Sequence, residues 1–176
     1  KRMNRTYTQA QFLSLTDRIR NILPGCGIST DMIVGFPGET EEEFDETLAV
    51  MEKIKFDSAF TFKYSSRPGT KAAEYNDHIP EEVKEIRLAK LLDSQHEHTL
   101  FRNRQEIGKT VNVLVEKESK KSSSEWAGRT DNNKWVIFPK GSAEIFDFVD
   151  VTIIDARGVS LFGEIIQVGK KPHAVV

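Results

Sequence analysis

The amino-acid sequence predicts an α/β region followed by a small all-β barrel. Up to Gly108, stretches with a helical spacing of apolar residues alternate with short β-rich runs, an order typical of parallel strands joined by helices. After Gly108 the pattern changes to short β-rich runs separated by Ser, Asn, Asp, Gly and Pro. The fold class is therefore α/β, with parallel strands in the first part and a closed β-barrel at the end.

Spacing and capping residues predict the first helix and the strand after it. Apolar residues recur at helical spacing over residues 8–23, where Thr8 is a suitable N-cap and the Pro-Gly pair at 24–25 ends the helix. The apolar run over residues 28–34 then predicts a buried strand.

A capping box predicts the second helix. Thr40 and Glu43 have the spacing at which each side chain accepts a hydrogen bond from the other's backbone N–H. The apolar face of this helix consists of Phe44, Leu48, Met51 and Ile54.

Aromatic alternation and a proline predict the next two elements. Phe60, Phe62 and Tyr64 alternate as in a strand, and Pro80 suits the first position of a long helix that ends near Gly108. The apolar face predicted for this helix consists of Val83, Ile86, Ala89 and Leu92.

Five β-rich runs predict the closed barrel. The change of pattern falls between Arg104 and Thr110, so the chain divides into a first domain of residues 1–106, a barrel of residues 107–168 and a tail of residues 169–176. The predicted strands are residues 110–116, 126–130, 135–138, 148–154 and 161–166.

Composition limits the classes of function. The 176 residues are 38% hydrophobic and 30% charged, which is ordinary for a globular protein. A net charge of -2 argues against a generally basic nucleic-acid binder, so any RNA affinity must come from local clusters of Lys and Arg. A single cysteine excludes an internal disulfide framework and favours a reducing compartment, and no apolar run is long enough for a membrane span. We therefore expect a cytoplasmic location.

The first domain is expected to be the end of a larger barrel. Two parallel strands cannot close a barrel, and their edges would leave backbone groups unpaired. We therefore expect the missing strands to precede this sequence and the chain by itself to be inactive.

Candidate functional residues follow the two parallel strands, because such folds bind ligands at the carboxyl ends of their strands. Asp31 is a carboxylate in an apolar strand, so it should have a cationic or hydrogen-bonding partner or a ligand. The Gly-Phe-Pro-Gly-Glu-Thr segment at 35–40 has no phosphate-loop spacing and is predicted to be a turn, with Glu39 in a structural role. Arg67 is either a ligand contact or a surface residue of a turn.

The barrel mixes cations with aromatic residues, a combination that suits unpaired RNA. The same aromatic residues can instead fill the barrel core, which we expect for Trp135 and Phe138. His96 and His98 do not share a helix face and are expected to be solvated, and Cys26 has no cysteine partner, so no metal site is predicted on this chain.

Several motifs in order resemble one known family. These are DMIVGFPGET at 31–40, the strand at 56–64 with RPGT at 67–70, and GRTDNNKWVIFP at 128–139. Together with the opening KRMNRTYT they resemble the later strands of the radical S-adenosylmethionine (SAM) barrel in tRNA methylthiotransferases, followed by their RNA-binding TRAM domain. The resemblance covers residues 1–167. It implies that the first domain is the C-terminal portion of a radical SAM (βα) partial TIM barrel and that the barrel is an OB-like TRAM domain.

The resemblance also implies roles for particular residues. Asp31 would contact the polar part of SAM, Arg5 would bind its carboxylate, and Gly35 would let the backbone approach adenine. The other residues implied for the cofactor site are Ile33, Val34 and Tyr64. The residues implied for binding RNA are Arg67, Trp126, Arg129 and Lys134. Position 66 is Ser where relatives often have Pro, whereas Arg67-Pro68 favours RNA over a protein substrate.

The implied activity is methylthiolation at C2 of an N6-isopentenyladenosine beside the tRNA anticodon. One 4Fe-4S cluster would cleave SAM reductively to a radical and a second would deliver sulfur, with an external reductant and with all cluster ligands outside this chain. The implied partners are the tRNA anticodon stem-loop and the N-terminal part of the same enzyme. Three alternatives stay open: action on threonylcarbamoyl-adenosine, a non-catalytic RNA-binding module, and an unrelated nucleotide-binding α/β domain.

Overall fold

The computed structural model describes residues 2–168 and divides the chain into two compact units, Lys1–His98 and Thr99–Val176. The predicted tail, residues 169–176, lies outside the described residues. Within the described part, no helix is both long enough and apolar enough to cross a membrane.

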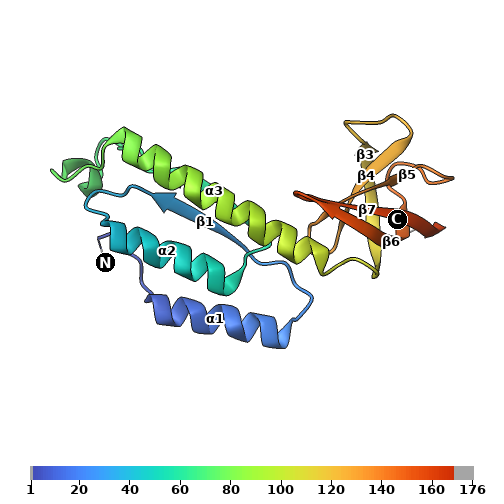
Figure 1. Cartoon of the computed structure of the whole chain (residues 1–176), viewed down its shortest axis with the longest axis horizontal. Coiled ribbons are helices and arrows are strands. Elements are labelled where there is room, and N and C mark those ends of the chain that lie inside the picture. Colours follow the sequence, from blue (N-terminus) through green and yellow to red (C-terminus); the bar gives the residue numbers. More distant parts are fainter. Residues whose placement is uncertain (1, 169–176) are drawn as a thin grey trace, which may run out of the picture. The chain divides into compact units, whose positions relative to one another are not determined.

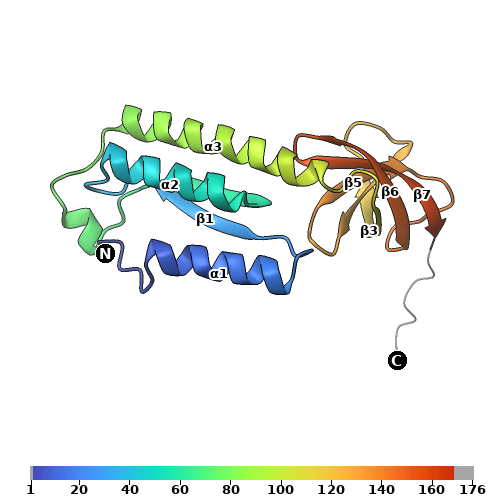
Figure 2. The same cartoon turned by 60° about the horizontal axis from the view of Figure 1, so that its bottom comes forward.

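The first unit alternates helices and strands. Its elements are α1 (Gln9–Ile22), β1 (Ser29–Val34), α2 (Glu41–Ile54), β2 (Ser58–Lys63), the short 3-10 helix η1 (Lys71–Glu74) and the greater part of α3 (Glu81–Arg104). The strands β1 and β2 pair in parallel, with Ser29 opposite Ser58 and Val34 opposite Lys63. Figures 1 and 2 show the three α-helices running lengthwise beside the strands. The predicted α/β order is confirmed.

Both predicted helix starts are confirmed by their caps. The Thr8 side chain accepts from the backbone N–H of Gln11, and the Gln11 side chain accepts from the backbone N–H of Thr8, which completes a capping box. Thr40 and Glu43 form the same arrangement at the start of α2. Each box satisfies two backbone donors that a helix start leaves without a partner.

The helices cover only one face of the strand pair. Met32 and Val34 of β1 pack into a core with side chains from α1, α2 and α3, and that core includes the fully buried Phe44, Met51 and Leu91. The other face carries Asp31 and Ile33 of β1 and, in register with them, Phe60 and Phe62 of β2. These four side chains, which we call the open face, are all exposed. The prediction of a buried strand at 28–34 is therefore wrong for one of its two faces.

The helix α3 buries a different face from the one predicted. Ile86, Ala89 and Leu92 are exposed, whereas Arg87 and Leu91 are buried. Ion pairing decides which face is buried. The buried guanidinium of Arg87 pairs with the carboxylate of Glu39, which precedes α2, and with that of Glu41, the first residue of α2. Gln95 and His98 continue the buried face, and their side chains bond to the Phe56 carbonyl (3.0 Å) and to Glu52 (2.8 Å). His98 is thus buried, contrary to the prediction that it is solvated.

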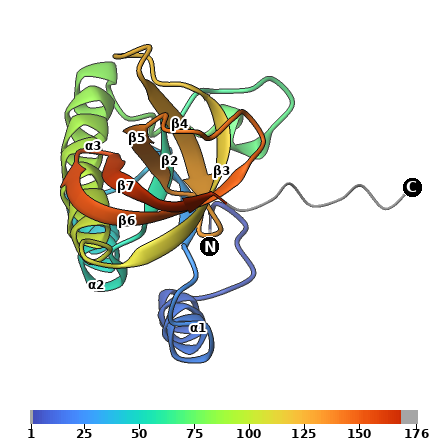
Figure 3. The same cartoon turned by 90° about the vertical axis from the view of Figure 1, so that its right-hand side faces the viewer.

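The second unit is a closed barrel of the five predicted strands, confirmed in number and order. Its strands are β3 (Thr110–Glu118), β4 (Glu125–Thr130), β5 (Trp135–Pro139), β6 (Phe148–Arg157) and β7 (Ser160–Val168), and they close in the order β3-β4-β5-β7-β6. All neighbouring pairs are antiparallel except β5 and β7. Figure 3 shows these strands curling around a common centre.

The end of α3 belongs to this second unit. Leu100 packs against the barrel core. Asn103, which is 1% exposed, donates to the Gly158 carbonyl and accepts from the Nζ of Lys134 at 3.1 Å. The last turn of the helix is therefore tied to two of the turns that join barrel strands.

Candidate functional site

A cleft of about 630 Å³ opens at the carboxyl ends of β1 and β2. Its walls come from four segments: the N-terminal stretch before α1, the ends of both strands, and the loop after β2. This is the edge at which α/β folds bind ligands. The lining residues are Met3, Arg5, Asp31, Ile33, Phe36, Phe62, Lys63, Tyr64, Ser65, Arg67, Thr70 and Ala72.

The cleft brings together five residues that the sequence singled out. Arg5, Asp31, Ile33, Tyr64 and Arg67 all line it, although they span more than sixty positions of the sequence. Arg5, Asp31 and Arg67 are exposed. Within residues 2–168, none of these three charged groups forms a side-chain hydrogen bond or an ion pair. The cleft thus offers two cations and one carboxylate to a ligand.

The expectation that Asp31 is buried beside a partner is wrong. Its carboxylate lies on the open face, where no helix covers it, so the cost of desolvation that required a partner does not arise in this chain. Asp31 remains a candidate because of its place in the cleft.

Val34 does not line the cleft. Its side chain is fully buried in the core between strand and helices, because successive residues of a strand point to opposite faces. Ile33 and Val34 therefore cannot both face a ligand. The apolar wall consists instead of Ile33 with Phe62, its partner in the register, and Phe36. The sequence analysis did not name Phe62 as a cleft residue, although the alternation of Phe60, Phe62 and Tyr64 along the strand is a signal that could have identified it.

Gly35 has a structural reason to be glycine. Its φ is +73°, and a Cβ here would come within 2.2 Å of the Lys84 side chain. Its N–H donates to the Glu39 carboxylate at 2.7 Å, and the same carboxylate oxygen accepts from Arg87 at 2.7 Å. Glu39 thus fixes the turn, as the sequence predicted, whereas the ion pair with Arg87 was not foreseen.

Tyr64 stands at the junction between strand and loop. Its ring packs edge-on against Phe36, with the centroids 5.3 Å apart, and lies 6.2 Å from the ring of His78. Its backbone N–H donates to the Val34 carbonyl at 2.8 Å, which extends the pairing of the two strands by one residue. The phenol oxygen is buried and has no hydrogen-bond partner among the described residues.

A second ion pair braces the turn beside the cleft. Arg2 donates two hydrogen bonds to Asp77, at 2.7 and 2.8 Å, and its guanidinium lies 4.4 Å from the centroid of Tyr75. The hydrogen bonds from Arg2 lower the pKa of Asp77 below its usual value. A Cβ at Gly38 would come within 2.0 Å of the Arg2 side chain, so glycine lets this pair reach the turn. Sequence reasoning missed this link.

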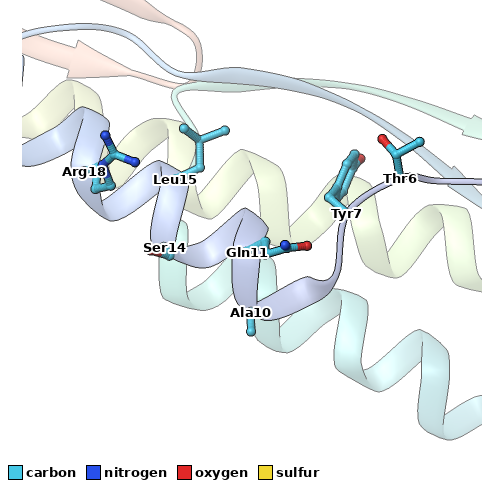
Figure 4. Close-up of a pocket in the computed structure, with 7 residues that line it drawn as sticks. All are labelled: Thr6, Tyr7, Ala10, Gln11, Ser14, Leu15 and Arg18. Carbon is cyan, nitrogen blue, oxygen red and sulfur yellow. The ribbon is translucent and has the colours of Figure 1, made fainter.

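A second, shallower hollow of about 490 Å³ runs along the exposed side of α1 (Figure 4). Tyr7 and Leu15 contribute half-exposed apolar surface to it, and Arg18 lies at one end. No carboxylate and no buried polar group lines it, so it offers surface for packing but no chemistry.

Two of the three barrel residues predicted to bind RNA are buried. Trp126 is 9% exposed and donates its indole N–H to the Ala143 carbonyl at 2.9 Å, so it is a core residue and no stacking platform. Lys134 is 7% exposed and bonds to Asn103, which leaves its charge out of reach of a phosphate.

The sequence analysis expected Trp126 to contact RNA and Trp135 to lie in the core, and the structure shows the reverse burial of the two residues. Trp135 is only partly buried and lies on the outside of the barrel, whereas we expected it in the core. Phe138 is 1% exposed and confirms the core prediction. Arg129, the third predicted RNA residue, is near the surface but is held by Glu116 at 2.7 Å. The hydrogen bond from Arg129 to Glu116 raises the pKa of the guanidinium, so this arginine stays charged.

Within residues 2–168, no group of three or more His, Cys, Asp or Glu side chains is placed to hold a metal ion. The sequence contains one cysteine, Cys26. An iron-sulfur cluster is usually held by several thiolates, so the residues of this chain do not fit one.

Comparison with known proteins assigns the barrel and relates the whole chain to one group. The sequence model of the TRAM domain matches residues 104–166. Proteins named tRNA-2-methylthio-N(6)-dimethylallyladenosine synthase are similar over nearly the full chain. The protein of Christiangramia forsetii is 46% identical over 165 residues, which are 93% of this chain and 34% of that protein. Those of Clostridium novyi and Porphyromonas gingivalis are each 45% identical over 166 residues, or 94% of this chain, and 37% and 36% of their own lengths.

The chain spans about a third of the length of these curated relatives. The part of the relatives that the match covers is the C-terminal one. Over nearly its whole length, the chain is therefore similar to the C-terminal part of these relatives.

Proposed function

We propose that this chain is the C-terminal part of an enzyme that adds a methylthio group to C2 of an N6-isopentenyladenosine next to the tRNA anticodon. The observation that carries the proposal is the cleft, where residues from four segments gather at the carboxyl ends of parallel strands. The names of relatives at about 45% identity support the choice of reaction.

The predicted first domain, residues 1–106, which contains the first unit, is in this proposal the end of a radical SAM partial barrel. The open face supports it, because Phe60 is 64%, Phe62 is 52% and Ile33 is 38% exposed. In a barrel of parallel strands with helices outside, this face would line the interior and be covered by the remaining strands. Those strands would come from the N-terminal part of the same protein.

The cleft residues fit SAM. The Arg5 guanidinium suits the carboxylate of the amino-acid part, and the Asp31 carboxylate can accept hydrogen bonds from an ammonium or from ribose hydroxyls. Ile33, Phe36 and Phe62 supply an apolar wall for adenine. When bound and reduced by a cluster, SAM supplies the radical that removes an inert hydrogen. The two 4Fe-4S clusters would be held by residues outside this chain, and an external reductant would reduce them.

The TRAM domain supports tRNA as the partner, and such an enzyme would work in the cytoplasm. Asp31 is exposed in this chain, so its burial cannot be used to distinguish an enzyme from a non-catalytic RNA-binding module. Binding of SAM is the property that distinguishes an enzyme from such a module.

The test is an Asp31→Ala variant of the full-length protein with its clusters reconstituted. Loss of a charge-assisted hydrogen bond should weaken SAM binding roughly 10- to 100-fold, since such a bond contributes about 1.5 to 3 kcal/mol. Isothermal titration with SAM measures this. The matched control is Asp45→Ala, which removes an exposed carboxylate from α2, away from the cleft, and should leave the affinity unchanged.

If Asp31→Ala kept its iron content and bound SAM as tightly as Asp45→Ala does, the cleft would not be the SAM site. Mass spectrometry of tRNA after turnover identifies the modified nucleoside. A 2-methylthio product on threonylcarbamoyl-adenosine in place of isopentenyladenosine would overturn the proposed substrate.

A further inference from the structure

The outside of the TRAM barrel carries a surface of aromatic and cationic side chains, centred on Trp135, which the sequence analysis had placed in the core. It is formed where β4, β5 and β7 lie side by side. In the register, Arg129 of β4 is opposite Trp135 of β5, and Ile137 of β5 is opposite Phe162 of β7. Because residues two apart in a strand share a face, Trp135, Ile137 and Phe162 form one continuous apolar strip on the outer face. We call this strip with its cations the outer platform.

Cations flank both aromatic rings of the outer platform. The Nζ of Lys117 lies 4.4 Å from the centroid of Trp135, and the guanidinium carbon of Arg129 lies 5.1 Å from it. Arg157 lies 4.9 Å from the centroid of Phe162. Contacts of this kind at exposed sites are worth about 0.5 to 1 kcal/mol each, so a base can displace a cation from a ring at little cost.

The three cations differ in whether a carboxylate or another polar group already holds them. Arg129 is held by Glu116 and by a 2.9 Å hydrogen bond to Asn133, and Arg157 pairs with Asp155 at 2.6 Å. Lys117 is exposed and contacts only the tryptophan ring, with no carboxylate partner among the described residues. It is therefore the cation that can turn to a phosphate without breaking an ion pair.

The turn between β4 and β5 holds the platform in place. Asn133 has a φ of +63°, a left-handed conformation that asparagine tolerates better than most residues. Its side chain positions Arg129, and the neighbouring Lys134 is anchored in the interior by Asn103. Trp135 thus follows directly after a residue that is fixed from inside the barrel.

We propose that the outer platform is the surface on which unpaired bases of RNA stack, with Trp135 as the main contact and Lys117 meeting the adjoining phosphate. The inference rests on the proposed function, because it takes RNA as the partner of the barrel. Exposed aromatic rings bind bases through their faces, and neighbouring cations neutralise the backbone. A peptide or a second copy of the chain would use the apolar strip but would not need the unpaired charge of Lys117.

The test uses the complete protein and two probes, a single-stranded anticodon-loop RNA and a blunt RNA duplex with the same number of phosphates. Trp135→Ala should weaken binding of the single strand about 5- to 150-fold, the range measured for one stacked base, and should change duplex binding little. Trp135→Phe should restore most of the affinity. The matched control is Phe146→Ala, which removes an aromatic residue that is 67% exposed elsewhere on the barrel. It should have no effect.

The charge is tested separately. Lys117→Gln should lower the magnitude of the slope of log K against log salt by about 0.7 for the single strand, as expected for the loss of one phosphate contact.

The outcomes of these experiments distinguish the proposed function from the proposed role of the outer platform. If the wild-type protein binds neither RNA, the proposed function fails. If it binds the single strand and folded Trp135→Ala binds equally well, only the outer platform is refuted.

A measurement on the unmodified protein covers the case in which Trp135→Ala does not fold. The chain has two tryptophans, and the indole N–H signal of Trp135 should shift in the NMR spectrum on adding the single strand. The signal of Trp126, whose N–H is bonded inside the barrel, serves as the internal control and should not move. Equal shifts of both signals, or dimerisation that depends on Trp135, would overturn the inference.

Discussion

Arg87 shows how one buried side chain organises the first unit. Its guanidinium is 6% exposed and donates to Glu39 at 2.7 Å and to Glu41 at 3.0 Å. Through Glu39 it also fixes the turn at Gly35, beside the cleft. A cation at a buried helix position would be costly without these carboxylates. The hydrogen bond from Arg87 also lowers the pKa of Glu41.

Replacing Arg87 by methionine should destabilise the first unit by about 3 to 5 kcal/mol, because it leaves the Glu39 carboxylate buried without its cation. Urea unfolding followed by helical circular dichroism measures the change. Lys90→Met is the matched control, since its side chain is 53% exposed and lies 3.6 Å from the same Glu41. It should cost less than about 1 kcal/mol. Equal stability of the two variants would contradict the role given to Arg87.

At the scale of elements, ion pairs join the end of β2 to the start of α3. Glu81 accepts from Lys63 of β2 at 2.5 Å and from Lys84 one turn further along the helix at 2.6 Å. Hydrogen bonds from Lys63 and then Lys84 lower the pKa of Glu81 to about 2. The carboxylate also lies in the first turn of α3, where a negative charge is favourable.

This pKa predicts part of the acid sensitivity. Because the folded state lowers the pKa of Glu81 from its ordinary 4.5 to about 2, its stabilisation is complete above pH 4.5 and is lost as the pH falls to 2. Glu81→Gln should therefore flatten the decline in stability between these values. Glu82→Gln, which removes the neighbouring exposed carboxylate, should leave the decline as it is. NMR titration of the Glu81 carboxyl carbon measures the pKa directly, and a midpoint near 4.5 would contradict the prediction.

At the scale of the whole molecule, the two units differ in how completely they bury their own surfaces. The barrel closes its sheet and has a core that includes the fully buried Val113, Val136 and Leu161. The first unit has a two-stranded sheet whose open face exposes three large apolar side chains. A closed barrel removes strand edges, whereas a two-stranded sheet leaves two of them.

A protein made of residues 99–176 should therefore fold by itself and unfold cooperatively. Residues 1–98 should bind the dye ANS through the open face, and replacing Phe60 and Phe62 by serine should reduce that binding. Circular dichroism and dye fluorescence measure both effects. An unfolded barrel fragment, or dye binding that does not depend on Phe60 and Phe62, would contradict this account.

The sequence by itself determined the local features of this protein. The N-cap at Thr8, the capping box of Thr40 and Glu43, the turn at residues 35–40, the order of helices and strands and the five barrel strands were all predicted, because each depends on residues close together in the chain. The cleft residues Arg5, Asp31, Ile33, Tyr64 and Arg67 also followed from the rule that ligands bind at the carboxyl ends of parallel strands, together with the family resemblance.

Only the tertiary structure decided which face is buried in α3 and in the strands of the barrel. Trp126 and Trp135 are both aromatic residues in short strands, yet Trp126 faces inward opposite Phe138 and Trp135 faces outward opposite Arg129. A shift of one residue reverses every side chain of a strand, and the closure of the barrel, not the local sequence, fixes that choice. Two buried cations likewise depend on partners distant in the sequence. Arg87, on the buried face of α3, pairs with the carboxylates of Glu39 and Glu41. Lys134 donates to the amide oxygen of Asn103. Burial of a charge is decided by the partner that compensates it, and that partner is known only once the chain has folded.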